Sequence, residues 1–199
     1  MDVLPWIFSS GWASGLNGYA VVLLLGVFGR FFGADGVPPA LQRTDVLIAA
    51  AVLTAIDLVA DKVPYLDSAW DTVHTVIRPG IAAAVAALIA GQAGTLNEAV
   101  AAGIAAVTAL ASHTVKAGLR AAVNTSPEPA SNLVISTAED VTVAGVVALG
   151  VVYPWAAAVI AGVLLVIGAV VVLVLLRTIR AFRARRRASA LDNRSRTTG

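Results

Sequence analysis

Long runs of apolar residues alternate with short polar segments along this chain of 199 residues. A transmembrane helix needs about 20 mostly apolar residues to cross a hydrocarbon core about 30 Å thick. Six apolar segments meet or approach this length, at residues 16–32, 45–59, 80–93, 96–123, 136–152 and 155–176. The pattern predicts an all-α integral membrane protein with about six transmembrane helices, of which the second is short for a full crossing.

Residues 61–79 carry charged and apolar side chains at helical spacing. If this segment is helical after Pro64, then Asp67, Asp71, His74 and Arg78 share one face of the helix. The opposite face carries apolar residues, namely Leu66, Ala69, Trp70, Val73 and Ile77. Such an amphipathic helix could lie along the membrane interface, or it could line a polar cavity inside a helix bundle.

The fourth apolar segment is unusually polar in its second half, where His113, Lys116 and Arg120 occur. The residues that follow, 124–132, include two prolines, which remove backbone donors and favour extended geometry. A re-entrant or broken segment near 124–132 is therefore expected. Pro154 divides the uncharged stretch 141–176 into the fifth and sixth spans.

Composition agrees with a membrane protein, because 58% of the residues are hydrophobic and only 13% are charged. The absence of cysteine excludes disulfides, iron–sulfur clusters and thiolate zinc sites. Residues 1–176 carry a net charge of −5, whereas residues 177–199 carry +7 through eight arginines and Asp192. Arginines directly after an apolar helix favour a topology anchor on anionic lipid headgroups over a nucleic-acid reader.

The charge distribution also predicts topology. Six spans place both termini on one side, and the arginine-rich end places that side in the cytoplasm. We therefore expect a multi-pass protein of the bacterial cytoplasmic (inner) membrane with a single transmembrane domain, 1–176. Residues 177–199 are expected to form a disordered cytoplasmic tail.

Two short sequence echoes suggest internal repeats. Ala13-Ser14-Gly15 resembles Ala111-Ser112-His113, and His74-Thr75-Val76 recurs as His113-Thr114-Val115. Halves at 11–94 and 95–176, with three spans each, would form inverted repeats, as in many transporters. The many Ala and Gly residues permit close helix packing, and we expect a homo-oligomer.

Three motifs lie at residues 13–19 (ASGLNGY) with 26–30 (GVFGR), at 61–67 (DKVPYLD) with 70–79 (WDTVHTVIRP), and at 124–132 (NTSPEPASN). Together they resemble a bacterial multi-pass membrane family, domain of unknown function 4126. The resemblance covers about residues 11–176 and implies a membrane topology but no activity. This family usually has Glu where this chain has Asp57.

Ionisable groups in or near a membrane tend to pair with each other or to line a polar route. The candidate site residues form two groups, one after the second span and one around the break after the fourth. They are Asp57, Asp61, Lys62, Asp67, Asp71, His74, Arg78, His113, Lys116, Arg120, Asn124, Glu128, Glu139 and Asp140. We expect the two groups to meet only if one of them dips into the membrane as a re-entrant element.

Several roles are open to these residues. Asp57 and Asp61, one helical turn apart, could bind a proton or cation, with Asp71 and His74 as a relay. Lys116 and Arg120 could bind an anionic group with help from Arg78. Alternatively, the charges neutralise each other and fix the register of the helices.

The function that this pattern favours is a small transporter or channel-like permease with a proton- or ion-linked site. A non-catalytic scaffold or lipid-interacting protein is the alternative, and a lipid-phosphate translocase using Lys116 and Arg120 is a third. No phosphate loop, nucleophile elbow or zincin motif occurs, so we expect neither enzyme activity nor a cofactor. For His74 we expect a hydrogen-bonded role rather than metal ligation.

Overall fold

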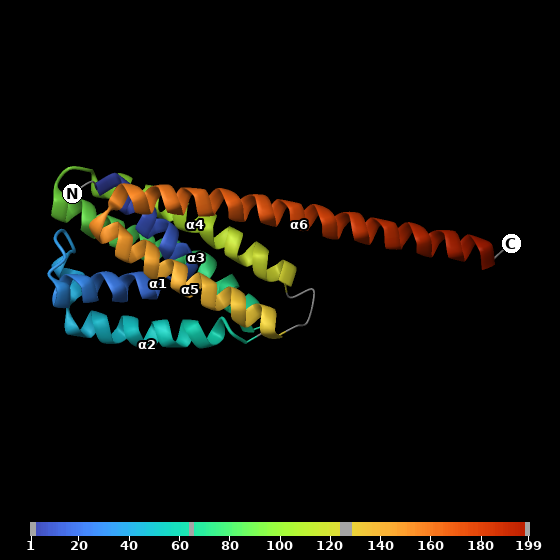
Figure 1. Cartoon of the computed structure of the whole chain (residues 1–199), viewed down its shortest axis with the longest axis horizontal. Helices are drawn as coiled ribbons and strands as arrows, with labels where there is room; N and C mark the ends of the chain where they lie inside the picture. Colours follow the sequence, from blue (N-terminus) through green and yellow to red (C-terminus); the bar gives the residue numbers. More distant parts are fainter. Residues whose placement is uncertain (1–2, 64–65, 124–128, 198–199) are drawn as a thin grey trace.

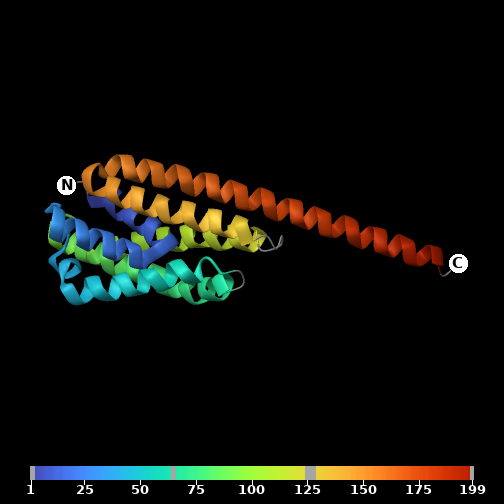
Figure 2. The same cartoon turned by 60° about the horizontal axis from the view of Figure 1, so that its bottom comes forward.

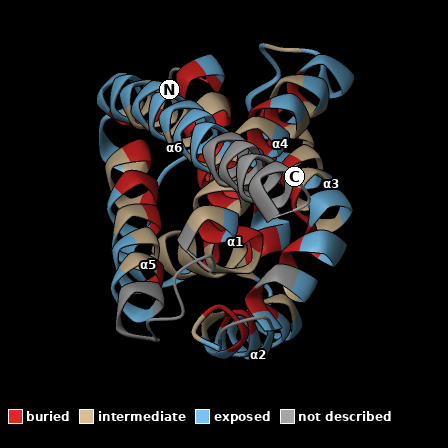
Figure 3. Cartoon of the chain, turned by 90° about the vertical axis from the view of Figure 1, so that its right-hand side faces the viewer, coloured by how far each residue is buried: buried red, intermediate tan, exposed pale blue. Residues whose placement is uncertain are grey.

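The computed structural model describes residues 3–63, 66–123 and 129–197, and within these ranges it is helical with no strand (Figure 1). The elements in order are α1 (Val3–Phe32), the short 3₁₀ helix η1 (Pro39–Gln42), α2 (Thr44–Ala60), α3 (Leu66–Ala93), α4 (Glu98–Val123), α5 (Pro129–Val152) and α6 (Pro154–Thr197). The other helices surround α1, so α1 forms the centre of the bundle (Figure 3).

Five of the six helices are long and apolar enough to cross a membrane. The exception is α2, whose 17 residues extend about 26 Å. Apolar side chains cover much of the outer surface, as lipid contact requires, and Val76 on α3 is 78% exposed. The prediction of an all-α, multi-pass membrane protein is confirmed.

The first helix differs from the span expected at 16–32. It begins at Val3 and is broken at Asn17, whose backbone is extended (φ −152°, ψ 93°). The pattern predicts a span only from residue 16, because the residues before the break include small polar side chains. Ser9 and Ser10 are buried because their hydroxyls donate to the carbonyls of Trp6 and Ile7 in the same helix.

The break turns α1 back on itself. Val3 and Trp6, near its start, line the same pocket as Asp35 and Gly36, which follow its end. The two half-helices, each about 20 Å long, therefore form a re-entrant hairpin whose tip at Asn17 lies inside the bundle (Figures 1 and 2). A re-entrant segment is thus found in α1, whereas one was expected at 124–132. Residues 129–132 begin α5, and residues 124–128 lie outside the described part of the chain.

This turn affects where the two ends of the described chain lie. The helices α2 to α6 run along the bundle, whereas α1 enters and leaves at one end (Figure 1). The first and last described residues, Val3 and Thr197, consequently lie at opposite ends of the molecule (Figures 1 and 2). The prediction that both termini share one side of the membrane assumed that residues 16–32 cross it, and it stays a prediction.

The amphipathic segment and the third span form one continuous helix, α3, with Pro79 inside it. Its polar face points inward, since Asp67, Asp71 and Arg78 are at most 4% exposed, whereas Val73 on the other side is 59% exposed. The polar face therefore lies inside the bundle and not along a membrane interface, while the polar cavity of the other alternative stays a prediction.

The last helix continues through the basic end of the chain as far as Thr197, where we expected disorder. Eight Arg and four Ala make up more than half of residues 177–197, and both are good helix formers. The 44 residues of α6 extend about 66 Å, more than twice the thickness of a hydrocarbon core. Its C-terminal part projects beyond the other helices, and Arg177 and Arg180 are exposed (Figure 2).

Close contact between α1 and α4 leads to a first prediction. A Cβ atom on Gly15 would overlap Ser112 Oγ and the Ala109 carbonyl group. Gly15→Ala is therefore expected to lower the free energy of unfolding by about 1–3 kcal/mol, as other overpacked sites do. Unfolding in mixed micelles measures this loss. The control is Gly103→Ala on the exposed side of α4, where a Cβ meets no atom within 4 Å and no loss is expected.

Candidate functional site

Among the described residues, ten ionisable side chains meet inside the bundle, and we call this group the charge cluster. Its members are Asp57, Asp61, Asp67, Asp71, His74, Arg78, His113, Lys116, Arg120 and Glu139. Nine of them are at most 4% exposed, and 13% of the Glu139 side chain is exposed. Charges buried this deeply require partners, because their transfer out of water costs much more than that of neutral polar groups.

Helical spacing explains how three elements supply most of the charge cluster. Asp57 and the C-cap residue Asp61 lie one turn apart at the end of α2. The four members on α3 repeat every three or four residues and so share a face, as do the three members on α4. Because α3 and α4 pack side by side along their length, these faces meet beside the tip of α1.

Arg78 joins the carboxylates of two helices. Its Nη1 donates to Asp71 Oδ1 at 3.2 Å, and its Nη2 donates to Asp57 Oδ1 at 3.2 Å. Nη1 also lies 3.4 Å from the carbonyl oxygen of Gly15 and 3.1 Å from His113 Nδ1. The guanidinium group thus links α1, α2, α3 and α4.

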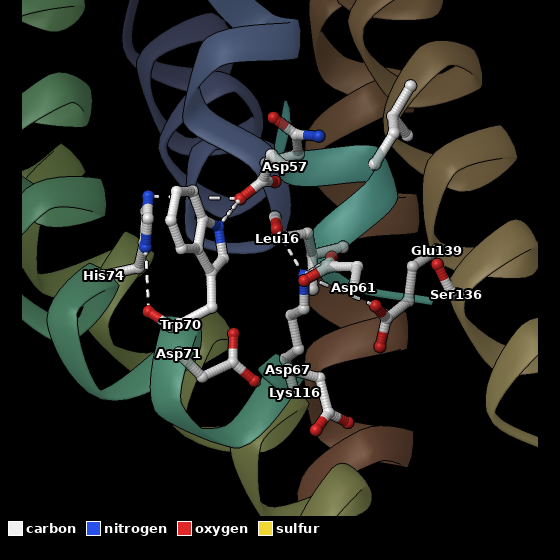
Figure 4. Close-up of polar contacts among 12 residues, drawn as sticks. Leu16, Asp57, Asp61, Asp67, Trp70, Asp71, His74, Lys116, Ser136 and Glu139 are labelled. Atoms are coloured by element: carbon white, nitrogen blue, oxygen red, sulfur yellow. Dashed lines mark hydrogen bonds and ion pairs between the residues drawn. The ribbon is translucent and has the colours of Figure 1, made fainter. Parts of the chain in front are cut away.

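Asp61 is the acceptor for the two cations of α4, of which Figure 4 shows Lys116. Its Oδ2 lies 2.5 Å from Lys116 Nζ and 3.1 Å from Arg120 Nη2. Burial disfavours the charged form of Asp61, but Lys116, Arg120 and Arg78 outweigh this effect and hold the pKa of its carboxyl below the usual value. Arg120 continues the network to α5 by donating to Glu139 Oε2 at 2.8 Å.

All three cations of the charge cluster also bind backbone carbonyl groups. Lys116 Nζ donates to the carbonyl of Leu16 at 2.9 Å, and Arg120 Nη1 donates to that of Asp61 at 2.9 Å. The Leu16 carbonyl is free because the amide of Ala20, its helical partner, donates to Asn17 Oδ1 instead. The break in α1 thus creates an acceptor that Lys116 fills, at a half-helix C-terminus where cations are favoured.

The two histidines have different roles. A guanidinium group can only donate, so His113 Nδ1 accepts from Arg78, and His113 Nε2 carries the proton that it donates to the Asp71 carbonyl at 3.0 Å. His113 is therefore neutral. His74 Nδ1 donates to the carbonyl of Trp70 at 2.8 Å, which leaves Nε2 facing Tyr19 Oη at 3.1 Å and Asp57 Oδ1 at 4.0 Å.

A profile of the family described as a domain of unknown function (DUF4126) matches residues 4–174. The chain belongs to this family. Both the broken helix and the charge cluster lie within the DUF4126 match, whereas the basic end of α6 lies beyond it. No curated protein and no solved structure was found to match the chain.

Of the fourteen candidate residues, the structure brings together ten in the middle of the DUF4126 domain. Lys62 and Asp140 form a separate ion pair, with Nζ and Oδ2 3.1 Å apart, and their side chains are 33% and 23% exposed. Asn124 and Glu128 lie outside the described residues. The two predicted groups meet directly, because the helices that carry them place them at the same level of the bundle. Within the described chain, this meeting does not need a re-entrant element.

Sequence reasoning missed some functional contacts of the DUF4126 domain. Trp70, expected on the apolar face of α3, donates from Nε1 to Asp57 Oδ1 at 2.6 Å (Figure 4). Tyr19, Gly15 and Leu16 were not identified because they act at the break in α1. Asn17-Gly18 within an apolar run was the signal for that break. In the described part of the chain, no group of three or more His, Asp or Glu side chains is arranged to hold a metal ion.

Proposed function

We propose that this membrane protein is a small proton-linked transporter and that the charge cluster is its coupling site. The observation that carries the proposal is an imbalance of buried charge. The cluster contains five carboxylates but three cations, so with neutral histidines its formal charge is −2. A buried excess of negative charge favours the uptake of protons or other cations.

The geometry supports particular roles. Each of the three cations is held by a backbone carbonyl as well as by carboxylates, so the cations are the fixed members of the cluster. The carboxylates and His74 are then the members that exchange protons. His74 Nε2 connects the partly exposed Tyr19 with the buried Asp57, and it is the proton acceptor that we propose for the entry step.

The same contacts argue against an anion site. Lys116 and Arg120 are each bound by Asp61 and Glu139, and an added phosphate would have to displace these carboxylates. A lipid-phosphate translocase is therefore less well supported than a proton-linked transporter.

We further propose that the basic end of α6 lies in the cytoplasm against anionic lipid or a partner protein, with the start of α1 on the other side of a bacterial inner membrane.

Proton flux into proteoliposomes tests the proposal. A pH-sensitive dye inside the vesicles reports proton entry when a potassium gradient with valinomycin sets the membrane potential. We expect faster acidification with the wild-type chain than in empty vesicles. His74→Asn keeps an N–H group that can donate to the Trp70 carbonyl but has no titratable nitrogen, and it is expected to reduce the rate to that of empty vesicles.

The matched control is Asp45→Asn, because Asp45 pairs with Arg43 on the surface and both side chains are about two-thirds exposed. This variant is expected to keep the wild-type rate. Wild-type vesicles that acidify no faster than empty ones would contradict the proposal, as would a His74→Asn variant that retains the full rate.

A further inference from the structure

A cavity of about 250 Å³ lies beside the charge cluster, between the first half of α1 and the helices α4, α5 and α6. Its wall is mainly apolar and includes Trp12, Leu119 and Leu164. Lys116 and Glu139 are the charged residues that line it. The cavity lies where α4 and α5 hardly contact each other, and α6 packs against both of them (Figure 3).

The two charged residues of the cavity wall differ in how fully they are bound. Lys116 Nζ contacts the Leu16 carbonyl, Asp61 Oδ2 at 2.5 Å and Glu139 Oε2 at 3.5 Å, so its three donors have acceptors. Glu139 Oε2 accepts from Arg120, but Oε1 is buried and accepts no hydrogen bond from the described residues. The charged group of this wall that still has an atom without a hydrogen-bond partner among the described residues is therefore an anion, the carboxylate of Glu139.

We propose that this cavity binds an organic cation with an apolar body, and that the carboxylate of Glu139 binds its charged group. The inference rests on the proposed function and specifies its substrate class. The apolar wall of the cavity takes the body of such a molecule. The cationic group reduces the charge of −2 in the cluster, whereas an organic anion of the same size would increase it.

A consequence of this assignment is competition with protons. A carboxylate that binds an organic cation releases that cation when it is protonated, so the cavity couples cation binding to proton release. Exchange of one bound cation for protons on the same cluster is the simplest cycle that this arrangement allows.

Binding of benzyltrimethylammonium to the full chain in phosphatidylcholine nanodiscs tests the inference, with benzylsulfonate as an anionic probe of similar size. Isothermal titration calorimetry is expected to show saturable binding of the cation, weaker binding at acidic pH, and none of the anion. Glu139→Gln is expected to weaken cation binding by about tenfold or more, since it removes the charge of the acceptor. Glu98→Gln, which changes an exposed acid at the start of α4, is the matched control and is expected to bind as the wild type does.

A second pair of variants tests the cavity itself without touching any charge. Ala138→Trp fills the cavity from an exposed position on α5, whereas Ala144→Trp adds the same side chain at an exposed position of α5 that does not line it. Only the first is expected to abolish cation binding.

Equal binding of the cation and the anion, or unchanged cation binding in both Glu139→Gln and Ala138→Trp, would overturn the inference. The proton flux measurement separates it from the proposed function. Proton flux without cation binding would overturn the cation site and leave proton-linked transport standing. Cation binding without proton flux into vesicles that enclose benzyltrimethylammonium would support the cation site and contradict proton-linked transport.

Discussion

Replacing Arg78 with leucine is expected to destabilise the protein by about 3–5 kcal/mol, the cost of leaving buried charges without their partner. Arg78 is 1% exposed and bonds to Asp57 and Asp71 in the interior of the bundle. Its removal leaves both carboxylates with less compensation in a cluster that already has excess negative charge. The free energy of unfolding in mixed micelles measures the loss.

A double variant distinguishes a charge effect from a loss of packing. Arg78→Leu combined with Asp71→Asn removes one of the unpaired carboxylates, so the two changes together are expected to cost less than Arg78→Leu alone. Arg43→Leu is the control, because it removes an arginine from an exposed pair with Asp45 and is expected to have no measurable effect. If the double variant were less stable than Arg78→Leu, Arg78 would not act mainly through these carboxylates.

Much of the fold could be predicted from the sequence, because apolar runs and helical spacing are local properties. The limits of α2 and α4 and the polar face of α3 were visible in this way, but not whether that face points inward. The re-entrant shape of α1 was not, since its first half contains serines and glycines and so lacks a long apolar run. Those residues are stable in the core only because neighbouring helices pack closely against them, and sequence spacing does not reveal that packing.

The candidate site, like the fold, could be predicted from the sequence only in part. Ten of the fourteen residues proposed from the sequence converge, because charged groups in an apolar bundle have few stable positions other than beside each other. What could not be predicted is the contribution of the backbone. The carbonyl of Leu16 becomes a ligand of Lys116 only because Asn17 interrupts the helix. The cavity beside Glu139 likewise depends on how α4, α5 and α6 pack.

Lys116 is the second residue whose replacement is expected to have a large effect, because it donates to the Leu16 carbonyl at the break in α1. Lys116→Met is expected to destabilise the protein by about 3–5 kcal/mol, since it removes a buried partner of Asp61. Adding Asp61→Asn is expected to recover part of this loss, because the unpaired charge is then gone. The remainder, about 1–3 kcal/mol, is the cost of a buried Leu16 carbonyl without a donor.

Lys62→Met provides the comparison for this prediction, because Lys62 forms a single, partly exposed ion pair with Asp140 and binds no broken-helix carbonyl. Its replacement is expected to cost about 1 kcal/mol or less. A full recovery in the Lys116→Met, Asp61→Asn double variant would mean that the Leu16 carbonyl needs no donor. The break at Asn17 would then be independent of the charge cluster. A partial recovery would mean that the same lysine stabilises the tip of the re-entrant helix and the anion that faces it, so that movement of α1 and the charge state of the cluster are coupled.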